Sequence, residues 1–134
     1  MTAEEKKVYL QTYQASLSCI ERYKVYISIV EEFKADYDRS LQWCHSPQVV
    51  QELTDQIKEL DTYKAEYQKV IEDKTKVCDH VISSIFSMPE ERDQALLSYR
   101  YIDGMTWEQI ADHMLYAMTH IHRLHNRALE HLEL

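Results

Sequence analysis

Apolar side chains recur every three or four residues along the first third of the chain, which is the spacing of one face of an α-helix. The stripe consists of Leu10, Tyr13, Leu17, Ile20, Tyr23, Ile27, Val30, Phe33, Tyr37 and Leu41. Before it, Thr2 and Glu5 fit a capping box, in which the two side chains satisfy backbone N–H groups at a helix start. The heptad-like spacing predicts a helix of roughly nine turns that pairs with a partner as in a coiled coil.

The pattern stops at residues 43–47 and then begins again. Ser46 is a favourable N-cap, and Pro47 suits the first helical position, where no N–H partner is needed. A second stripe follows at Val50, Leu53, Ile57, Leu60, Tyr63, Tyr67, Ile71, Cys78, Val81 and Ile85. Lys74 interrupts this stripe, and we expect its stem to lie along the seam. Two helices of about 40 residues joined by a short turn should pair antiparallel, each roughly 60 Å long.

The first helix carries more apolar surface than one partner can cover. Its middle is apolar over more than half of the circumference, at Tyr26, Ile27, Ile29, Val30 and Phe33. Either two hairpins dimerise, for example into a four-helix bundle, or the last third of the chain folds back on this patch. We favour a homodimer through the hairpin.

A more compact pattern begins at Pro89. A helix is expected over about residues 89–102, with Gly104 as the left-handed residue after it. Thr106 and Gln109 form another capping-box pair, so a short helix should run from there to about residue 114. A tight turn and a helix over about residues 118–132 complete the pattern. The predicted fold is all-α, with a hairpin over residues 1–87 and a three-helix helix-turn-helix domain over residues 88–134.

Composition supports this interpretation and limits the function. The chain has a single glycine and two prolines, which favours long helices over tight turns. It has no apolar run long enough to span a membrane and begins without a signal peptide, so we expect a cytoplasmic protein. The three cysteines form no C-x-x-C pair and are expected to be reduced thiols. The net charge of −8 argues against a protein that coats nucleic acid non-specifically.

Two segments of the last third resemble a known DNA-binding family. Residues 96–111, LLSYRYIDGMTWEQIA, have the apolar helix, glycine, threonine and Ile-Ala of the promoter-reading C-terminal domain of bacterial sigma factors. Residues 121–129, IHRLHNRAL, resemble its recognition helix. Together with the hairpin in front, the chain is similar to ArpU-like phage transcriptional regulators of Gram-positive bacteria. The resemblance implies a helix-turn-helix that binds double-stranded DNA, with host RNA polymerase as a further partner.

The sequence departs from this family at three positions. Leu115 stands where the family commonly has glycine, Ala117 where it has serine, and Gln109 where glutamate is common. A glycine would relieve strain in the turn. A serine would cap the recognition helix, and the loss of this cap costs about 1 kcal/mol. These changes should affect DNA affinity more than the fold.

The last helix has one apolar and one polar face at about 100° per residue. Ile121, Leu124, His125 and Ala128 should point to the core. The candidate DNA-binding residues are Thr119, His120, His122, Arg123, Asn126 and Arg127. Arginine can read guanine and asparagine can read adenine in the major groove, whereas a threonine or histidine near the helix start suits a phosphate or a base edge. A solvated polar face or a protein-docking face is the alternative.

Five of the seven histidines lie in the last 22 residues, at His113, His120, His122, His125 and His131. His122 and His125, three residues apart, could share a metal ion on one face of the helix. No Glu-x-x-His or H-E-x-x-H motif supports such a site, so we expect neither a metal nor a cofactor. These histidines could instead take up protons near pH ~6 and lessen the local acidity. No Gly-rich loop, nucleophile elbow or catalytic triad is present, so no catalytic residue is assigned and an enzyme is not expected.

The sequence therefore predicts a DNA-binding transcription regulator of phage or prophage type in the bacterial cytoplasm. Two alternatives stay open. Small terminase subunits of packaging machinery also combine helix-turn-helix units with helical hairpins, and they form rings. A pure protein-interaction module that has lost DNA binding would explain the net charge of −4 on residues 89–134, which hold 8 acidic and 4 basic groups.

Overall fold

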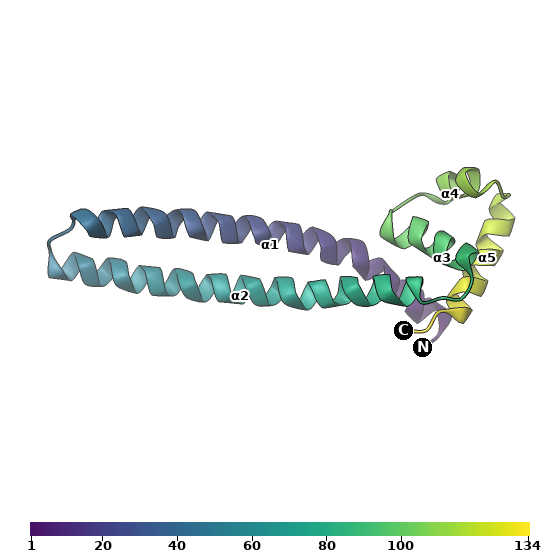
Figure 1. Cartoon of the computed structure of the whole chain (residues 1–134), viewed down its shortest axis with the longest axis horizontal. Coiled ribbons are helices and arrows are strands. Elements are labelled where there is room, and N and C mark those ends of the chain that lie inside the picture. The colour runs from purple at the N-terminus through teal and green to yellow at the C-terminus, as the bar shows by residue number, and fades with distance from the viewer. The chain divides into compact units, whose positions relative to one another are not determined.

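The computed structural model describes the whole chain, residues 1–134, and all its regular elements are helical (Figure 1). Two long helices, α1 (Ala3–Trp43) and α2 (Pro47–Phe86), come first. The shorter elements follow in the order α3 (Glu91–Leu97), the π-helical segment η1 (Ser98–Ile102), α4 (Trp107–Met114) and α5 (Met118–His131). The predicted all-α fold, a pair of long helices packed together and then a set of short ones, is confirmed. None of the helices has the length and apolar character that a membrane span requires.

The starts of both long helices follow the local sequence signals. The backbone N–H of Glu5 donates to the Thr2 hydroxyl at 3.2 Å, and the backbone N–H of Thr2 donates to the Glu5 carboxylate at 3.0 Å. The predicted capping box is therefore present. The second helix begins at Pro47, where proline's missing N–H costs no helical hydrogen bond.

Backbone contacts divide the chain into two compact units. One unit comprises Met1–Leu17 with Thr75–Leu134, and the other comprises Ser18–Lys74. The division crosses both long helices, so the short helices share their unit with the first turns of α1 and the last turns of α2. The sequence-based division into residues 1–87 and 88–134 places one boundary in the chain. The compact units differ from it, because one of them combines residues from both ends of the chain.

In the unit Ser18–Lys74, α1 and α2 lie side by side and antiparallel, as predicted (Figure 1). The Lys34 ammonium lies 2.5 Å from the Asp61 carboxylate, and the Lys64 ammonium lies 2.6 Å from the Glu31 carboxylate. Higher residue numbers on α1 therefore lie beside lower residue numbers on α2, as in an antiparallel pair. These ion pairs raise the pKa of Lys34 and lower the pKa of Glu31, because each charged form gains a hydrogen-bond partner.

The seam of this unit differs in detail from the predicted stripes. Phe33 and Tyr63, both counted in the stripes, are exposed, and half-buried Lys64 takes a place in the seam of α2. Lys74, expected to lie along the seam, is exposed. Among the apolar side chains of this unit, only Ile20 and Val30 are buried. Two helices cover one face of each other and leave the rest to solvent, so the core here is thin.

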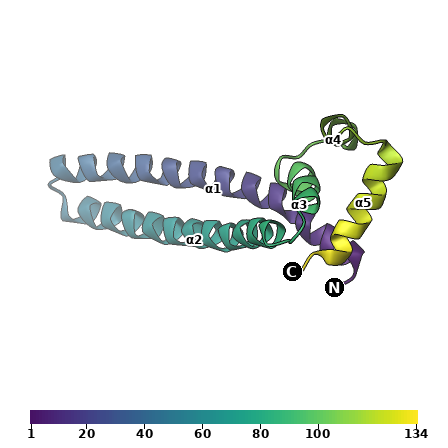
Figure 2. The same cartoon turned by 45° about the vertical axis from the view of Figure 1, so that its right-hand side comes forward.

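The other unit has the larger core. Helices α3, α4 and α5 share this unit with the start of α1 and the end of α2, and Figure 2 shows the end of α5 beside the first turns of α1. The Lys6 ammonium donates to the Leu129 carbonyl at 2.9 Å, and the Gln14 amide donates to the Ile102 carbonyl at 2.5 Å. The largest fully buried side chains are Leu10, Val81, Ile85, Leu96, Leu97, Ile110, Ile121 and Leu132.

The helix predicted over residues 89–102 is interrupted by a π-helical segment. The N–H of Asp103 donates to the Ser98 carbonyl at 2.9 Å, five residues back instead of four. The segment ends at Ile102, and Gly104, two residues further on, has a φ of +71°, which confirms the predicted left-handed residue. The nearest atom to a Cβ built at Gly104 would be 3.8 Å away, so the backbone angle rather than space favours glycine here.

Candidate nucleic-acid interface

Helices α4 and α5 are joined by a tight turn. Helix α4 begins with the predicted capping box, in which the Gln109 N–H donates to the Thr106 hydroxyl at 3.2 Å and the Thr106 N–H donates to the Gln109 side chain at 2.9 Å. Leu115 then adopts a left-handed conformation with φ 60° and ψ 40°, and its side chain is 88% exposed. A left-handed residue with a Cβ costs about 1–2 kcal/mol, so the missing glycine strains the turn.

Helix α5 begins without a side-chain cap. Ala117 is its N-cap residue, and its methyl side chain offers no hydrogen-bond acceptor to the first turn. The expected consequence of replacing serine at this position is therefore seen. The first N–H groups of α5 are left for solvent or for an added acceptor.

The buried face of α5 agrees with the sequence prediction. Ile121, Leu124, His125 and Ala128 are all buried. The helix-turn-helix core combines Ile121 and Leu124 with Leu96, Ile110 and Ala111 of the preceding helices. The side chains that pack against it are Tyr99, Met105, Trp107 and Met114. This packing sets the rotation of α5 and so decides which side chains face outward.

The six candidate DNA-binding residues lie on the outer side of α5. Five are exposed: Thr119, His122, Arg123, Asn126 and Arg127. His120 is half-buried, because its ring packs edge-on against Tyr116 with centroids 4.7 Å apart. His122 is exposed but contacts the Trp107 ring, with centroids 5.0 Å apart. The structure thus brings all six to one helix and fixes the two histidine rings, while the role of these residues in binding stays a prediction.

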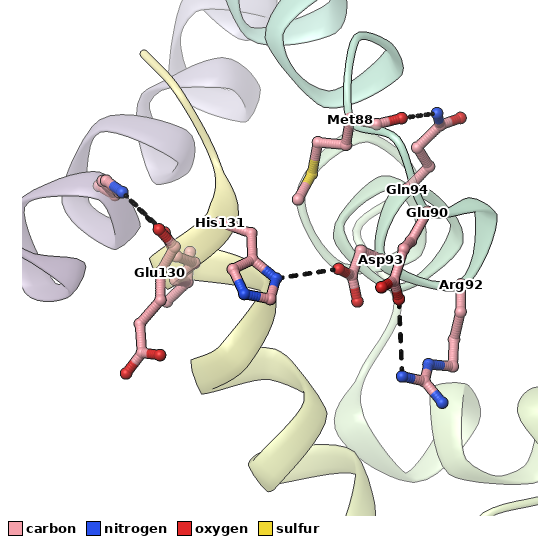
Figure 3. A network of polar contacts seen from close by, with 9 residues as sticks. Met88, Glu90, Arg92, Asp93, Gln94, Glu130 and His131 are labelled. Atoms are coloured by element: carbon pink, nitrogen blue, oxygen red, sulfur yellow. Dashed lines mark hydrogen bonds and ion pairs between the residues drawn. The ribbon is translucent and has the colours of Figure 1, made fainter.

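The four arginines of residues 89–134 fall into two classes. Arg100 lies over the Trp107 ring at 4.3 Å and donates to the Met105 carbonyl at 3.0 Å. Arg92 lies 3.7 Å from Glu90 (Figure 3), and its buried Nε has no hydrogen-bond partner. Arg123 and Arg127 are exposed, and neither is in an ion pair. The two arginines available to a ligand are therefore one turn apart on α5.

His125 is held inside the unit rather than at its surface. Its Nε2 lies 2.7 Å from the Tyr101 hydroxyl, and the two rings stack with centroids 5.8 Å apart. Burial lowers the pKa of His125 to about 4, and burial raises the pKa of Tyr101 to about 12. The idea that the five C-terminal histidines gain charge near pH ~6 is therefore wrong for His125, because burial removes the water that would solvate its charged form.

Some positioning residues were not found from the sequence. The Lys6 ammonium donates to the carbonyls of Leu129 and Glu130, which are among the last acceptors of α5. A cation at this end satisfies free carbonyls and suits the helix dipole. His131 lies 3.6 Å from the buried Asp93 carboxylate (Figure 3) and ties the same end of α5 to α3. No local sequence signal could have paired Lys6 with residues more than 120 positions away.

Residues 90–133 match the family model described as Sigma-70, region 4. No curated protein matches the chain, and no solved structure matches it. The match covers the last third of the chain and spans α3 through α5. Its limits enclose the two exposed arginines, the capped start of α4 and the turn at Leu115. The C-terminal third of this protein is therefore similar to Sigma-70 region 4, a DNA-binding helix-turn-helix region.

Proposed function

We propose that the protein is a sequence-specific, DNA-binding transcription regulator that acts by binding rather than by catalysis. The observation that carries the proposal is the pair Arg123 and Arg127. They are the two arginines of the helix-turn-helix that take part in no ion pair or cation–π contact, and both are exposed on its second helix. That helix is the element that enters the major groove in helix-turn-helix proteins.

The outer side chains of α5 suit the edges of base pairs. Arg123 and Arg127 can each donate two hydrogen bonds to guanine, and Asn126 between them can pair with adenine. Thr119 and His120 lie in the first turn, where the uncapped N–H groups of α5 favour a phosphate oxygen. Base contacts would then specify the site, and phosphate contacts would set the register.

The charge of residues 89–134 requires a further source of affinity. Eight acidic groups outnumber four arginines, so general attraction to phosphate is weak. We propose that the hairpin makes the protein a homodimer, which would present two recognition helices to two half-sites. The second contact would then be intramolecular and would raise the overall affinity.

The finer assignment follows the resemblance. We propose a regulator of phage or prophage type, similar to ArpU-like proteins, that works in the bacterial cytoplasm and contacts host RNA polymerase. The support is the combination of a long hairpin with a Sigma-70 region 4 helix-turn-helix in one chain.

The test is selection of binding sites from a random duplex library at moderate salt. The wild type is compared with Arg123→Ala/Arg127→Ala and with Arg39→Ala, which removes an exposed arginine from the hairpin. We expect one motif from the wild type and from Arg39→Ala, and no motif from the double variant. Failure of any motif to enrich even at low salt, where phosphate attraction is strongest, would contradict direct DNA reading.

A protein-interaction module is the second candidate. The acidic balance and the uncapped start of α5 favour it, because both weaken DNA binding. In this case Arg123→Ala/Arg127→Ala would keep the regulatory activity in cells, whereas a DNA-reading protein would lose it. A small terminase-like subunit would instead show the mass of a ring, well above that of a dimer.

A further inference from the structure

The hairpin in residues 18–74 leaves a second apolar face on α1 uncovered. The covered seam of α1 holds buried Val30 and half-buried Lys34, which pairs with Asp61 of α2. The uncovered face holds four large apolar side chains with 38–56% of their surface exposed. They are Val25 at 56%, Ile29 at 44%, Phe33 at 50% and, at the edge of this face, Tyr26 at 38%, whose ring centroid lies 5.8 Å from that of Tyr67 on α2.

These four side chains form one stripe. At about 100° per residue, the other three lie within about 60° of the direction of Ile29, and the covered seam lies roughly 130° away. A helix in a four-helix bundle presents two such seams, because it contacts two neighbours. Helix α2 has no equivalent second seam, since its exposed large apolar residues in this unit, Val49 and Tyr63, are about four turns apart.

Opposite charges bound the stripe. Arg22 precedes it and Asp36 follows it, both exposed and both within about 20° of the direction of Ile29. A second α1 placed antiparallel, with the two-fold axis at Ile29, would set Arg22 against Asp36 of the other copy at both ends. It would also set Val25 against Phe33. A parallel copy would bring Arg22 to Arg22 and Asp36 to Asp36, which repel.

Neither Arg22 nor Asp36 is held by a strong contact within the chain, so the two residues can pair across the interface. In the single chain, Asp36 contacts only Arg39 one turn away, and Arg22 lies 5.8 Å from the centre of the Tyr23 ring. Exposed pairs of this kind contribute little to stability, so they can rearrange at an interface. Tyr26 would meet Glu32 of the other copy, where its hydroxyl can donate to the carboxylate.

We propose that two copies of this chain associate through the stripe Val25, Tyr26, Ile29 and Phe33, with their α1 helices antiparallel and centred on Ile29. A self-complementary surface of this kind is what a two-fold dimer requires. The inference deepens the dimer in the proposed function and rests on the hairpin alone, so it holds or fails independently of DNA binding by α5.

Sedimentation equilibrium of the full chain without DNA tests the surface. The wild type should be a dimer, and Ile29→Lys should raise the dimer dissociation constant at least about 100-fold, because two ammonium groups would meet on the axis. The matched control is Val49→Lys on α2, which should leave the constant unchanged. Circular dichroism of each variant should show equal helix content. A wild type that is monomeric at roughly 0.1 mM, or an Ile29→Lys variant with the wild-type constant, would overturn the proposal.

Charge exchange tests the orientation. Arg22→Glu and Asp36→Arg should each weaken the dimer about tenfold, and the double variant should return to within about threefold of the wild type. Restoration is expected only for an antiparallel pair, because each altered residue then faces its altered counterpart. A double variant no stronger than the single ones would contradict the antiparallel register, and so would equal dissociation constants in all four proteins, which a parallel pair predicts because like charges face each other in every one of them.

Discussion

The Tyr101 hydroxyl lies 2.7 Å from Nε2 of His125, and both side chains are buried. This hydrogen bond joins η1 to α5 inside the unit that holds the helix-turn-helix. His125 also has its ring 4.7 Å from that of Trp107, the first residue of α4. One neutral histidine therefore links α5 to two other elements, η1 and α4, and its protonation should loosen both contacts.

Stability should fall in acid because of His125. The pKa of His125 is about 4 in the folded chain, against 6.5 as the ordinary value. Between these values the unfolded chain binds the proton more readily, so folding loses about 3 kcal/mol as the pH falls from 6.5 to 4. Urea unfolding across this range should show the loss in the wild type and not in His125→Gln. His45→Gln, in the hairpin turn, is the control. Equal pH dependence in all three proteins would contradict this account.

Two substitutions in the turn should stabilise the helix-turn-helix. Leu115→Gly removes the strain of a left-handed leucine, and we expect a gain of about 0.5–1 kcal/mol. Ala117→Ser supplies the missing cap of α5 and should add about 1 kcal/mol. Urea unfolding measures both, and Ala35→Ser, on the exposed surface of the middle of α1, serves as a control that should destabilise slightly. No gain from either turn variant would show that the turn is not strained in solution.

The first turn of α1 should stabilise the end of α5. Lys6→Met removes the ammonium that bonds the Leu129 and Glu130 carbonyls and should cost about 1–2 kcal/mol. Amide hydrogen exchange should accelerate in the last turns of α5, where the lost contact lies. Lys69→Met removes an exposed ion pair with Asp73 and should change little. Unaltered exchange in α5 of Lys6→Met would mean that the contact does not hold the helix end.

The salt dependence of DNA binding should distinguish the roles of the outer residues. If Arg123 neutralises a phosphate, Arg123→Ala should reduce the slope of log affinity against log salt by about 0.9 and weaken all sequences alike. If it reads guanine, the loss should be about 1–3 kcal/mol and confined to sites that carry that guanine. Equilibrium titrations on the selected site and on a scrambled duplex measure both. Arg127→Ala is interpreted in the same way.

The local sequence determined where α1, α2 and α4 begin and which side of α5 is apolar. Each of these local signals spans only a few residues and is found in the structure where its pattern predicts it. They are the capping boxes Thr2/Glu5 and Thr106/Gln109, the helix start at Pro47 and the left-handed Gly104. The buried positions of α5 follow from helical spacing alone. The helix starts can be predicted without distant contacts because they depend on hydrogen bonds within one turn, and the apolar face of α5 can be predicted because it depends on the helical repeat alone.

Only the tertiary structure decided how the segments share a core. It joined residues 1–17 to the short helices, with Lys6 at the end of α5 and Gln14 at the end of η1. It also exposed Phe33 where the spacing had placed it in the seam, and buried His125 so deeply that it stays neutral. Such outcomes depend on which surfaces meet when the chain folds. Burial by a distant segment cannot be predicted from the local pattern of residues, because that pattern does not specify which segment will cover it.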